Sequence, residues 1–197
     1  MCNHYRTIPE QIADWAVWAG YRPDAPFEAD VWPKRSAAIA RIENGQVVPD
    51  TMQWGVPLAT TGKSGKPITK YITNVRNLAS PFWRSMLTSP PQRCLVPFTS
   101  FAEPKLGTDA LTGRPAEHWF SLSDESIGAF AGIWRPIAGG HAFAFLTCEP
   151  NPLVAPLHPK AMPVILHPDD YQRWLTGNYE DACSLAVPFP SQLMQVA

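Results

Sequence analysis

Short runs of apolar residues dominate this chain, and most of them are typical of β-strands. RCLVPFTSF, HWFSL, GAFAGIW and HAFAFLTC are such runs, and turns containing glycine or proline separate several of them. AAIARI and QVV flank Glu43-Asn44-Gly45, and an Asn-Gly pair between two apolar runs predicts a β-hairpin. The pattern therefore predicts many short strands.

Helical signals are fewer and lie between or outside these runs. A Thr7-x-x-Glu10 capping box predicts a helix that continues through QIADWAVWA. SPFWRSML predicts a short helix with Ser80 as the cap and Pro81 in its first turn, and HPDDYQRWL predicts another. We expect an α+β fold with a curved or barrel-like, mostly antiparallel sheet and a few peripheral helices.

Length and composition indicate one packed domain. The chain has 197 residues, 45% of them hydrophobic, with eight tryptophans, which is enough to bury a substantial core. Its 22 prolines are about twice the usual share, which favours short elements joined by turns. We assign residues 2–190 to a single domain and 191–197 to a C-terminal tail.

No targeting or metal-binding signal stands out. MCNHYRTIPEQ lacks the apolar core of a signal peptide, and no apolar run reaches membrane-spanning length, so we expect a soluble, cytoplasmic protein without a membrane partner. The four cysteines show no Cys-x-x-Cys spacing; they are Cys2, Cys94, Cys148 and Cys183. We therefore expect no disulfide framework, no metal and no cofactor.

The formal net charge is only −1, but the charges are unevenly distributed. No acidic residue occurs between Asp50 and Glu103, where an even spread of the 17 acids would place four or five. That interval contains six basic residues: Lys63, Lys66, Lys70, Arg76, Arg84 and Arg93. Folding either gathers them into a surface that binds a polyanion or scatters them over different faces.

Cys2, directly after the initiator methionine, has two interpretations. A free cysteine is most often buried and behaves as a small hydrophobe. If Met1 is removed, however, Cys2 carries a free α-amine and a thiol on adjacent carbons, and this pair is a chemical reagent. No G-x-S-x-G elbow or cysteine-protease signature offers another nucleophile.

Other polar residues interrupt apolar surroundings, and each also has an ordinary explanation. Glu103 ends the run LVPFTSFAE and is either exposed at a strand end or a desolvated acid–base group. His158 is either a core histidine or part of a site. Asn74 and Arg76 alternate in YITNVRN, either on a solvated face or aimed together at a phosphate. Trp54 is a core residue by default and a stacking surface otherwise.

Taken together, the sequence resembles the SRAP family (SOS response-associated peptidase), the abasic-site processing proteins. The matching pieces run in order along nearly the whole chain, starting at Cys2. They are VWPKRSAAIAR, MQWGVP, NVRNLASPFWR, RCLVPFTSFAEP, FAGIWRP and LHPKAMPVIL.

The resemblance implies covalent capture of abasic sites in single-stranded DNA by an enzyme that acts as a monomer without a cofactor. The α-amine and thiol of Cys2 would close a thiazolidine on the sugar aldehyde. By family analogy Glu103 and His158 transfer protons, and Asn74 and Arg76 hold the site and its flanking phosphate. Arg84 and Trp54 are weaker candidates for the strand-binding surface. An abasic-site lyase activity and a peptidase activity limited to the protein's own N-terminus are also implied.

Three departures from the family pattern concern contacts with DNA. The usual Cys-Gly-Arg start is Cys2-Asn3-His4 here, Pro104 follows the glutamate where tryptophan is common, and the segment from His158 to Met162 is one residue longer. Two alternatives stay open, and the altered start and Pro104 motivate the first. One is a DNA-binding module of the same fold that no longer reacts, and the other is a peptide hydrolase that uses Cys2 as its N-terminal nucleophile.

Overall fold

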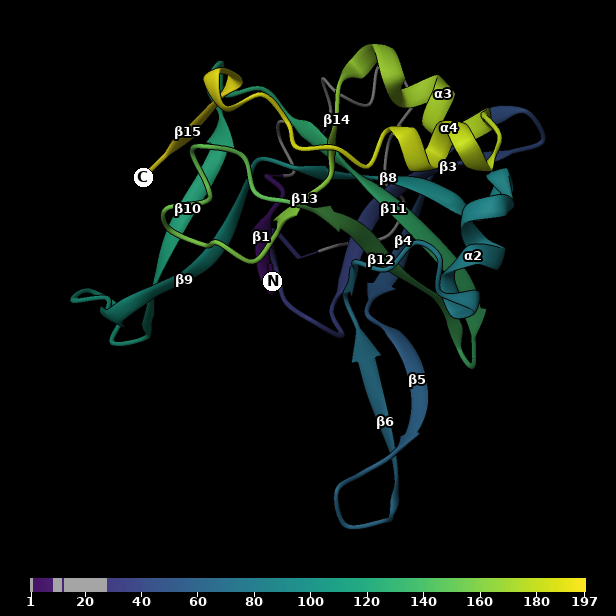
Figure 1. Ribbon diagram of the computed structural model, residues 1–197, viewed down its shortest axis with the longest axis horizontal. Coiled ribbons are helices and arrows are strands. Elements are labelled where there is room, and N and C mark those ends of the chain that lie inside the picture. The colour runs from purple at the N-terminus through teal and green to yellow at the C-terminus, as the bar shows by residue number, and fades with distance from the viewer. Residues whose placement is uncertain (1, 9–11, 13–27) are drawn as a thin grey trace.

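The computed structural model describes residues 2–8, 12 and 28–197, and β-strands dominate it (Figure 1). The strands are β1 (His4–Arg6), β2 (Asp30–Val31), β3 (Ser36–Glu43), β4 (Gln46–Trp54), β5 (Val56–Thr61), β6 (Pro67–Ile72), β7 (Asn74–Val75), β8 (Arg93–Phe98), β9 (Ser100–Thr108), β10 (Pro115–Leu122), β11 (Gly128–Ile137), β12 (Gly140–Cys148), β13 (Met162–Pro163), β14 (Ile165–Leu166) and β15 (Met194–Val196). The helices are α2 (Pro81–Thr88), α3 (Tyr171–Thr176) and α4 (Tyr179–Ser184), with 3-10 turns at Pro90–Gln92, Pro168–Asp170 and Ser191–Leu193.

Five strands close into a barrel in the order β12-β4-β3-β8-β11, with β11 pairing back to β12. The closing contact between β4 and β12 is parallel and aligns Trp54 with Phe143. The short pair between β7 and β12 is also parallel, and the other ladders of the described residues are antiparallel. The α+β, barrel-like and mostly antiparallel fold expected from the sequence is confirmed.

Stacked aromatic side chains fill the barrel. Phe98 lies parallel to Phe130 with 4.0 Å between ring centroids, and Phe130 contacts Phe145 at 4.7 Å. Phe145 in turn stacks on Trp54 at 5.3 Å. These rings come from β4, β8, β11 and β12, so burying them joins strands that are distant in sequence. The apolar runs that were predicted to be strands therefore enclose a single hydrophobic core.

The two ends of the chain belong to a second sheet, ordered β15-β10-β9-β1-β2. β1 lies between β9 and β2, which places the N-terminal strand inside a sheet. β15 pairs with β10 and aligns Val196 with Phe120, while Met194 is buried. Residues 191–197, assigned from the sequence to a C-terminal tail, contain a 3-10 turn and the edge strand β15. Their backbone hydrogen bonds and one buried side chain integrate them into the domain.

The predicted hairpin and two of the three predicted helices are present in the structure. The Asn44-Gly45 hairpin between β3 and β4 is confirmed, and both residues have the positive φ of such a turn (51° and 77°). Helix α2 is confirmed, although the Ser80 side chain makes no capping hydrogen bond. HPDDYQRWL forms a 3-10 turn followed by the short helix α3. The helix predicted to start at Thr7 falls mostly on residues 9–11 and 13–27, which lie outside the described residues.

Helix α4 was not predicted, although its cap is visible in the sequence. Asn178 accepts a hydrogen bond from the Asp181 backbone amide, and the Asp181 carboxylate accepts one from the Asn178 backbone amide. This reciprocal arrangement is a capping box with aspartate in the place of glutamate. None of the helices in the described ranges is both long and apolar enough to cross a lipid bilayer.

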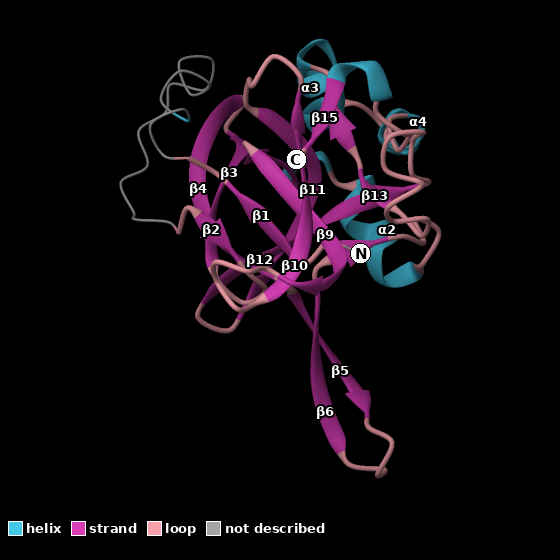
Figure 2. Ribbon diagram, turned by 90° about the vertical axis from the view of Figure 1, so that its left-hand side faces the viewer, coloured by secondary structure: helices cyan, strands magenta, loops and turns pink. Residues whose placement is uncertain are grey.

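Strands β5 and β6 form a two-stranded ribbon that extends away from the body of the molecule (Figures 1 and 2). Within the described part of the chain, their ladder hydrogen bonds are made only with each other. The root of the ribbon is fixed to the barrel, because the Gly55 amide donates to the Phe143 carbonyl at 2.8 Å. Val56, at the start of β5, is buried, whereas most of β6 is exposed.

Candidate active site around Cys2

Cys2 lies two residues before the start of β1 and is completely buried. Its thiol donates a hydrogen bond to the His4 carbonyl, with 3.4 Å between sulfur and oxygen. Burial, and secondarily the negative charge of Glu103, raises the pKa of the Cys2 thiol well above its ordinary value. The thiol is therefore protonated at rest, and its position is set by an ordered strand.

Asn74 on β7 holds the backbone of Cys2. Its side-chain amide donates to the Cys2 carbonyl at 2.9 Å and to the Thr73 hydroxyl at 2.8 Å. The amide oxygen of Asn74 is also buried and has no hydrogen-bond partner among the described residues. A buried acceptor of this kind is able to take a hydrogen bond from a bound molecule. Asn74 thus fixes Cys2 and offers one further polar contact.

Glu103 on β9 and His158, in the loop that precedes β13, form the titratable part of the cluster. The Glu103 carboxylate oxygen Oε2 lies 3.3 Å from His158 Nδ1. Burial raises the pKa of Glu103 from 4.5 to about 7. Burial, followed by nearby positive charges that include Lys160, lowers the pKa of His158. The pair therefore favours a neutral carboxylic acid beside a neutral imidazole, and Glu103 can gain or lose a proton near neutral pH.

These contacts bring four of the candidate residues together. Asn74 touches the backbone of Cys2, Glu103 acts electrostatically on the Cys2 thiol, and His158 touches Glu103. The four residues come from the N-terminus, β7, β9 and the loop before β13, so only the fold assembles them. The arrangement can position a nucleophile and move protons beside it.

The two candidate arginines differ in their surroundings and in their relation to this cluster. Arg76 follows β7, donates to the Cys148 carbonyl at 2.6 Å and forms an ion pair with Glu149. Arg84 on α2 lies over the ring of Tyr179 at 5.2 Å. Arg76 is close to the cluster in sequence, two residues after Asn74, whereas Arg84 contacts Tyr179 on α4, which contributes no residue to the cluster.

Trp54 is a core residue, which corrects its assignment to a strand-binding surface. It is fully buried, it stacks on Phe145, and its indole nitrogen donates to the Thr73 carbonyl at 3.2 Å. With no exposed ring face, it cannot stack on a nucleic-acid base. The same contact supports the cluster indirectly, because Thr73 immediately precedes Asn74.

The basic interval divides into separate groups in the structure. Arg93 is fully buried and donates to the carbonyls of Leu87 and Trp174, so its charge serves packing and not a surface. Lys63, Lys66 and Lys70 are exposed on the ribbon of β5 and β6. The six basic residues therefore neither form one surface nor scatter completely, since three of them share the projecting ribbon.

Sequence reasoning missed the contacts around His4. Its Nδ1 lies 2.9 Å from Glu117 and its Nε2 3.0 Å from Asp30, so both ring nitrogens face a carboxylate. The ring also stacks on Trp32 at 3.8 Å and meets Trp119 edge-on at 4.7 Å. We call His4, Asp30, Trp32, Glu117 and Trp119 the His4 clamp. The only signal in the sequence was that His4 departs from the family pattern.

The His4 clamp is joined to the active site through the backbone. The His4 carbonyl is the acceptor for the Cys2 thiol, and its side chain is held from β2 and β10. Both ring nitrogens of His4 lie within hydrogen-bond distance of a carboxylate, one on β2 and the other on β10. The clamp therefore stabilises the segment that carries Cys2.

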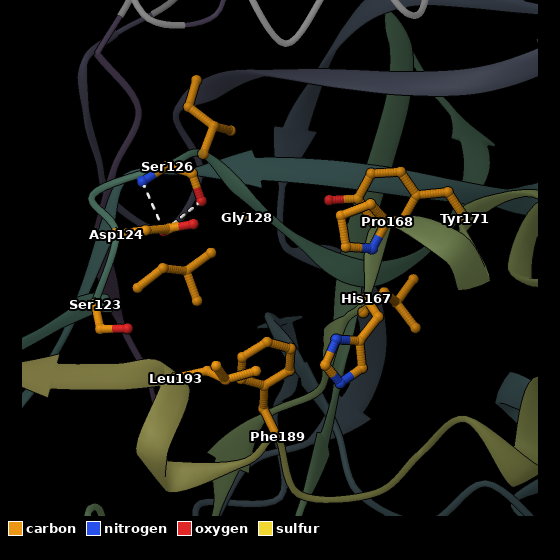
Figure 3. A pocket seen from close by; sticks show the side chains of 12 residues that line it. Ser123, Asp124, Ser126, Gly128, His167, Pro168, Tyr171, Phe189 and Leu193 are labelled. Atoms are coloured by element: carbon orange, nitrogen blue, oxygen red, sulfur yellow. Dashed lines mark hydrogen bonds between the residues drawn. The ribbon is translucent and has the colours of Figure 1, made fainter.

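Two surface cavities lie away from the cluster of Cys2, Asn74, Glu103 and His158. One, of about 310 Å³, is lined by His4, Arg6, Trp32 and Trp119 among others. The other, of about 220 Å³, lies between the end of β10, the start of β11 and β14 (Figure 3). In the described residues no group of histidine, cysteine, aspartate or glutamate side chains is arranged to hold a metal ion.

Several solved structures share the fold of this chain. A protein from Bordetella bronchiseptica is 25% identical, with a TM-score of 0.77 over 100% of this chain and 98% of that one. A protein from Bacteroides thetaiotaomicron is 18% identical, with a TM-score of 0.73 over 99% and 90%. A phage-related protein from Bordetella bronchiseptica is also 18% identical, with a TM-score of 0.69 over 100% and 92%. No curated protein matches the sequence.

The family comparison covers the whole chain. The family described as SOS response associated peptidase (SRAP) matches residues 1–197, which include every residue of the cluster and the strand β15. The chain therefore belongs to the SRAP family.

Proposed function

We propose that this protein crosslinks itself to abasic sites in single-stranded DNA through Cys2, once Met1 has been removed. The observation that carries the proposal is the placement of Cys2 against Asn74 and beside the pair formed by buried Glu103 and half-buried His158. An N-terminal cysteine needs an ordered backbone and a nearby proton carrier to condense with an aldehyde, and the cluster supplies both.

The reaction has two bond-forming steps. The neutral α-amine of Cys2 attacks C1 of the ring-opened sugar, and loss of one water from the carbinolamine gives an imine. The Cys2 sulfur then adds to the imine carbon, while the thiol proton is transferred to the imine nitrogen. The product is a five-membered thiazolidine plus one water, and no oxidant or reductant is required. Only an N-terminal cysteine has both groups on adjacent carbons.

Glu103 is the proton carrier in this scheme. With a pKa of about 7 it exists in both protonation states near neutral pH, so it can protonate the departing hydroxyl and later accept a proton. Because burial keeps the Cys2 thiol protonated, sulfur addition needs a base beside it. His158, held at 3.3 Å from Glu103, assists ring opening at the sugar oxygen.

The remaining candidate residues bind DNA in this scheme. The buried amide oxygen of Asn74 accepts a hydrogen bond from the sugar, while its nitrogen keeps Cys2 in place. Arg76 binds the flanking phosphate, which would replace Glu149 as its anionic partner. Arg84 is exposed on α2 and offers a more distant phosphate contact. DNA is the partner, and the protein acts in the cytoplasm as a monomer.

The proposal is tested by incubating the purified protein with single-stranded DNA that contains one abasic site. We expect an adduct that survives denaturing electrophoresis, and intact-mass measurement of the same sample should show that Met1 is absent. Cys2→Ala should abolish the stable adduct. Cys183→Ala, which removes a more exposed thiol, is the matched control and should react normally. A stable adduct formed by Cys2→Ala would overturn the mechanism.

The family description favours a second candidate function, hydrolysis of a peptide bond. Cys2 would be the nucleophile and the Glu103–His158 pair the acid–base system, with the protein's own N-terminus as the nearest substrate. This function predicts turnover of a peptide substrate that does not depend on an aldehyde in DNA. To separate hydrolysis from crosslinking, peptide cleavage and adduct formation are each measured for wild type, Cys2→Ala and Glu103→Gln. A module that binds DNA without reacting would show neither.

A further inference from the structure

The projecting ribbon of β5 and β6 is the largest feature that the active-site chemistry leaves unused. It is a two-stranded sheet in which Val56 pairs with Ile72 at the root and Thr61 pairs with Pro67 near the tip. Each strand has six residues, so the ribbon reaches about 20 Å from its root. Both figures show it standing clear of the remaining elements (Figures 1 and 2).

The ribbon is positively charged along its length. Lys63 and Lys66 lie in the turn at its tip, Lys70 lies on β6, and all three are exposed. No acidic residue occurs from position 51 to position 102, so nothing on the ribbon neutralises them. A fourth lysine extends the line to the root, where the Lys34 ammonium lies 4.5 Å from the centre of the Tyr71 ring.

The root of the ribbon is connected directly to the active site. Strand β6 ends at Ile72, Thr73 follows, and Asn74 then donates to the Cys2 carbonyl. Two hydrogen bonds fix this junction, from the Gly55 amide to Phe143 and from the Trp54 indole to Thr73. A strand of DNA held at Cys2 therefore lies beside the root of the basic ribbon, and that root is fixed to the barrel.

We propose that the ribbon is an arm that binds the phosphates of the single-stranded DNA flanking the abasic site. This inference rests on the proposed function. Lysines act as point charges for phosphate, and the serine, threonine and glycine residues near the tip leave their backbone accessible. The complete absence of acids favours a polyanion over a protein partner, for which mixed charges and aromatic anchors are typical. The arm extends the binding site beyond the reacting nucleotide.

The test compares wild type with the triple variant Lys63→Ala/Lys66→Ala/Lys70→Ala. Binding to an undamaged 30-nucleotide single strand, which cannot form the crosslink, is measured by fluorescence anisotropy over a range of salt concentrations. Each phosphate contact on single strands contributes about 0.7 to the slope of log affinity against log salt, so the slope should fall by about 2. At 0.1 M salt the affinity should fall roughly 10- to 100-fold.

A second measurement ties the arm to the flanking strand. With an abasic 5-nucleotide strand, too short to reach the tip, the triple variant should crosslink at the wild-type rate. With an abasic 30-nucleotide strand at subsaturating concentration it should crosslink more slowly. The matched control, Lys105→Ala/Arg114→Ala/Arg135→Ala, removes three exposed positive charges elsewhere and should have a smaller effect on both measurements.

The outcomes separate this inference from the function on which it rests. An unchanged salt slope for the triple variant, or an equal loss in the control, overturns the role of the arm even when wild type crosslinks normally. The same titration with a 30-base-pair duplex tests the preferred DNA form, and a loss seen with the duplex but not with the single strand overturns the assignment to single strands. If wild type forms no adduct with any abasic strand while the triple variant still loses affinity, the proposed crosslinking chemistry is wrong. The role of the ribbon in binding single-stranded DNA is then still supported.

Discussion

Glu103 shows how much a single residue depends on its surroundings. An exposed glutamate has a pKa near 4.5, and burial on β9 raises that of Glu103 to about 7. The raised value means that folding favours the protonated form. The stabilisation that this provides is complete below pH 4.5 and is lost as the pH rises through about 7.

Replacing Glu103 by glutamine should therefore change the dependence of stability on pH. Relative to wild type, Glu103→Gln should gain up to about 3 kcal/mol in unfolding free energy between pH 4.5 and pH 8, since one pKa unit corresponds to about 1.4 kcal/mol. Urea denaturation at several pH values measures the difference. Glu125→Gln, in an exposed turn, should follow wild type at every pH, and equal behaviour of the two variants would contradict the argument.

The His4 clamp leads to a second prediction at this scale. His4→Ala removes hydrogen bonds to Glu117 and Asp30 and the stack on Trp32, so we expect a loss of about 2–4 kcal/mol in unfolding free energy. Arg6→Ala removes an exposed pair with Asp30 and should cost less than about 1 kcal/mol. Denaturant unfolding compares them, and equal losses would refute a special role for the clamp.

The members of the site were visible in the sequence, but their convergence was not. Asn74, Glu103 and His158 interrupt apolar runs, so each was visible as a polar exception. Their convergence on Cys2 was inferred from family resemblance, because partners separated by up to 156 residues leave no local pattern. Trp54 was ambiguous for the opposite reason, since a tryptophan in an apolar run fits a core and a stacking surface equally well.

At the scale of elements, short apolar runs revealed strands but not their partners. The runs that became β8, β11 and β12 were readable because continuous apolar residues fit a sheet buried on both faces. The parallel contact that closes the barrel between β4 and β12 was not readable, since it depends on register between segments about 90 residues apart. Strands of two or three residues, such as β1 and β15, have no period to detect.

The tight contact between β8 and β11 permits a test of this packing. A methyl group added at Gly132 would lie 2.7 Å from the Cys94 sulfur and 2.8 Å from a Val96 methyl carbon, so Gly132→Ala should cost about 1–3 kcal/mol. At Gly62 the added methyl group would lie 3.3 Å from its nearest neighbour, the Cγ2 methyl of Ile68, so Gly62→Ala should be nearly neutral. Denaturant midpoints compare the variants, and a neutral Gly132→Ala would show that the strands can separate.

At the scale of the whole molecule, both ends of the chain complete one sheet. Deleting residues 191–197 exposes the edge of β10 and removes the buried Met194, so we expect the thermal midpoint to fall by about 5–10 °C. Thermal unfolding followed by circular dichroism measures this. Met194→Leu keeps the volume and the strand and should change the midpoint by less than half as much. An unchanged thermal midpoint after the deletion would show that residues 191–197 contribute little to the stability of the domain.

The position of β1 has a consequence for how the protein matures. Tyr5 pairs with Phe101, which is synthesised 96 residues later. At typical rates of translation this delay is roughly 5–20 s, during which β1 has no partner on that side. An aminopeptidase that removes Met1 therefore has access to the nascent chain before the sheet forms and Cys2 becomes buried. Under the proposed function, the reactivity of the folded protein therefore depends on removal of Met1 during translation.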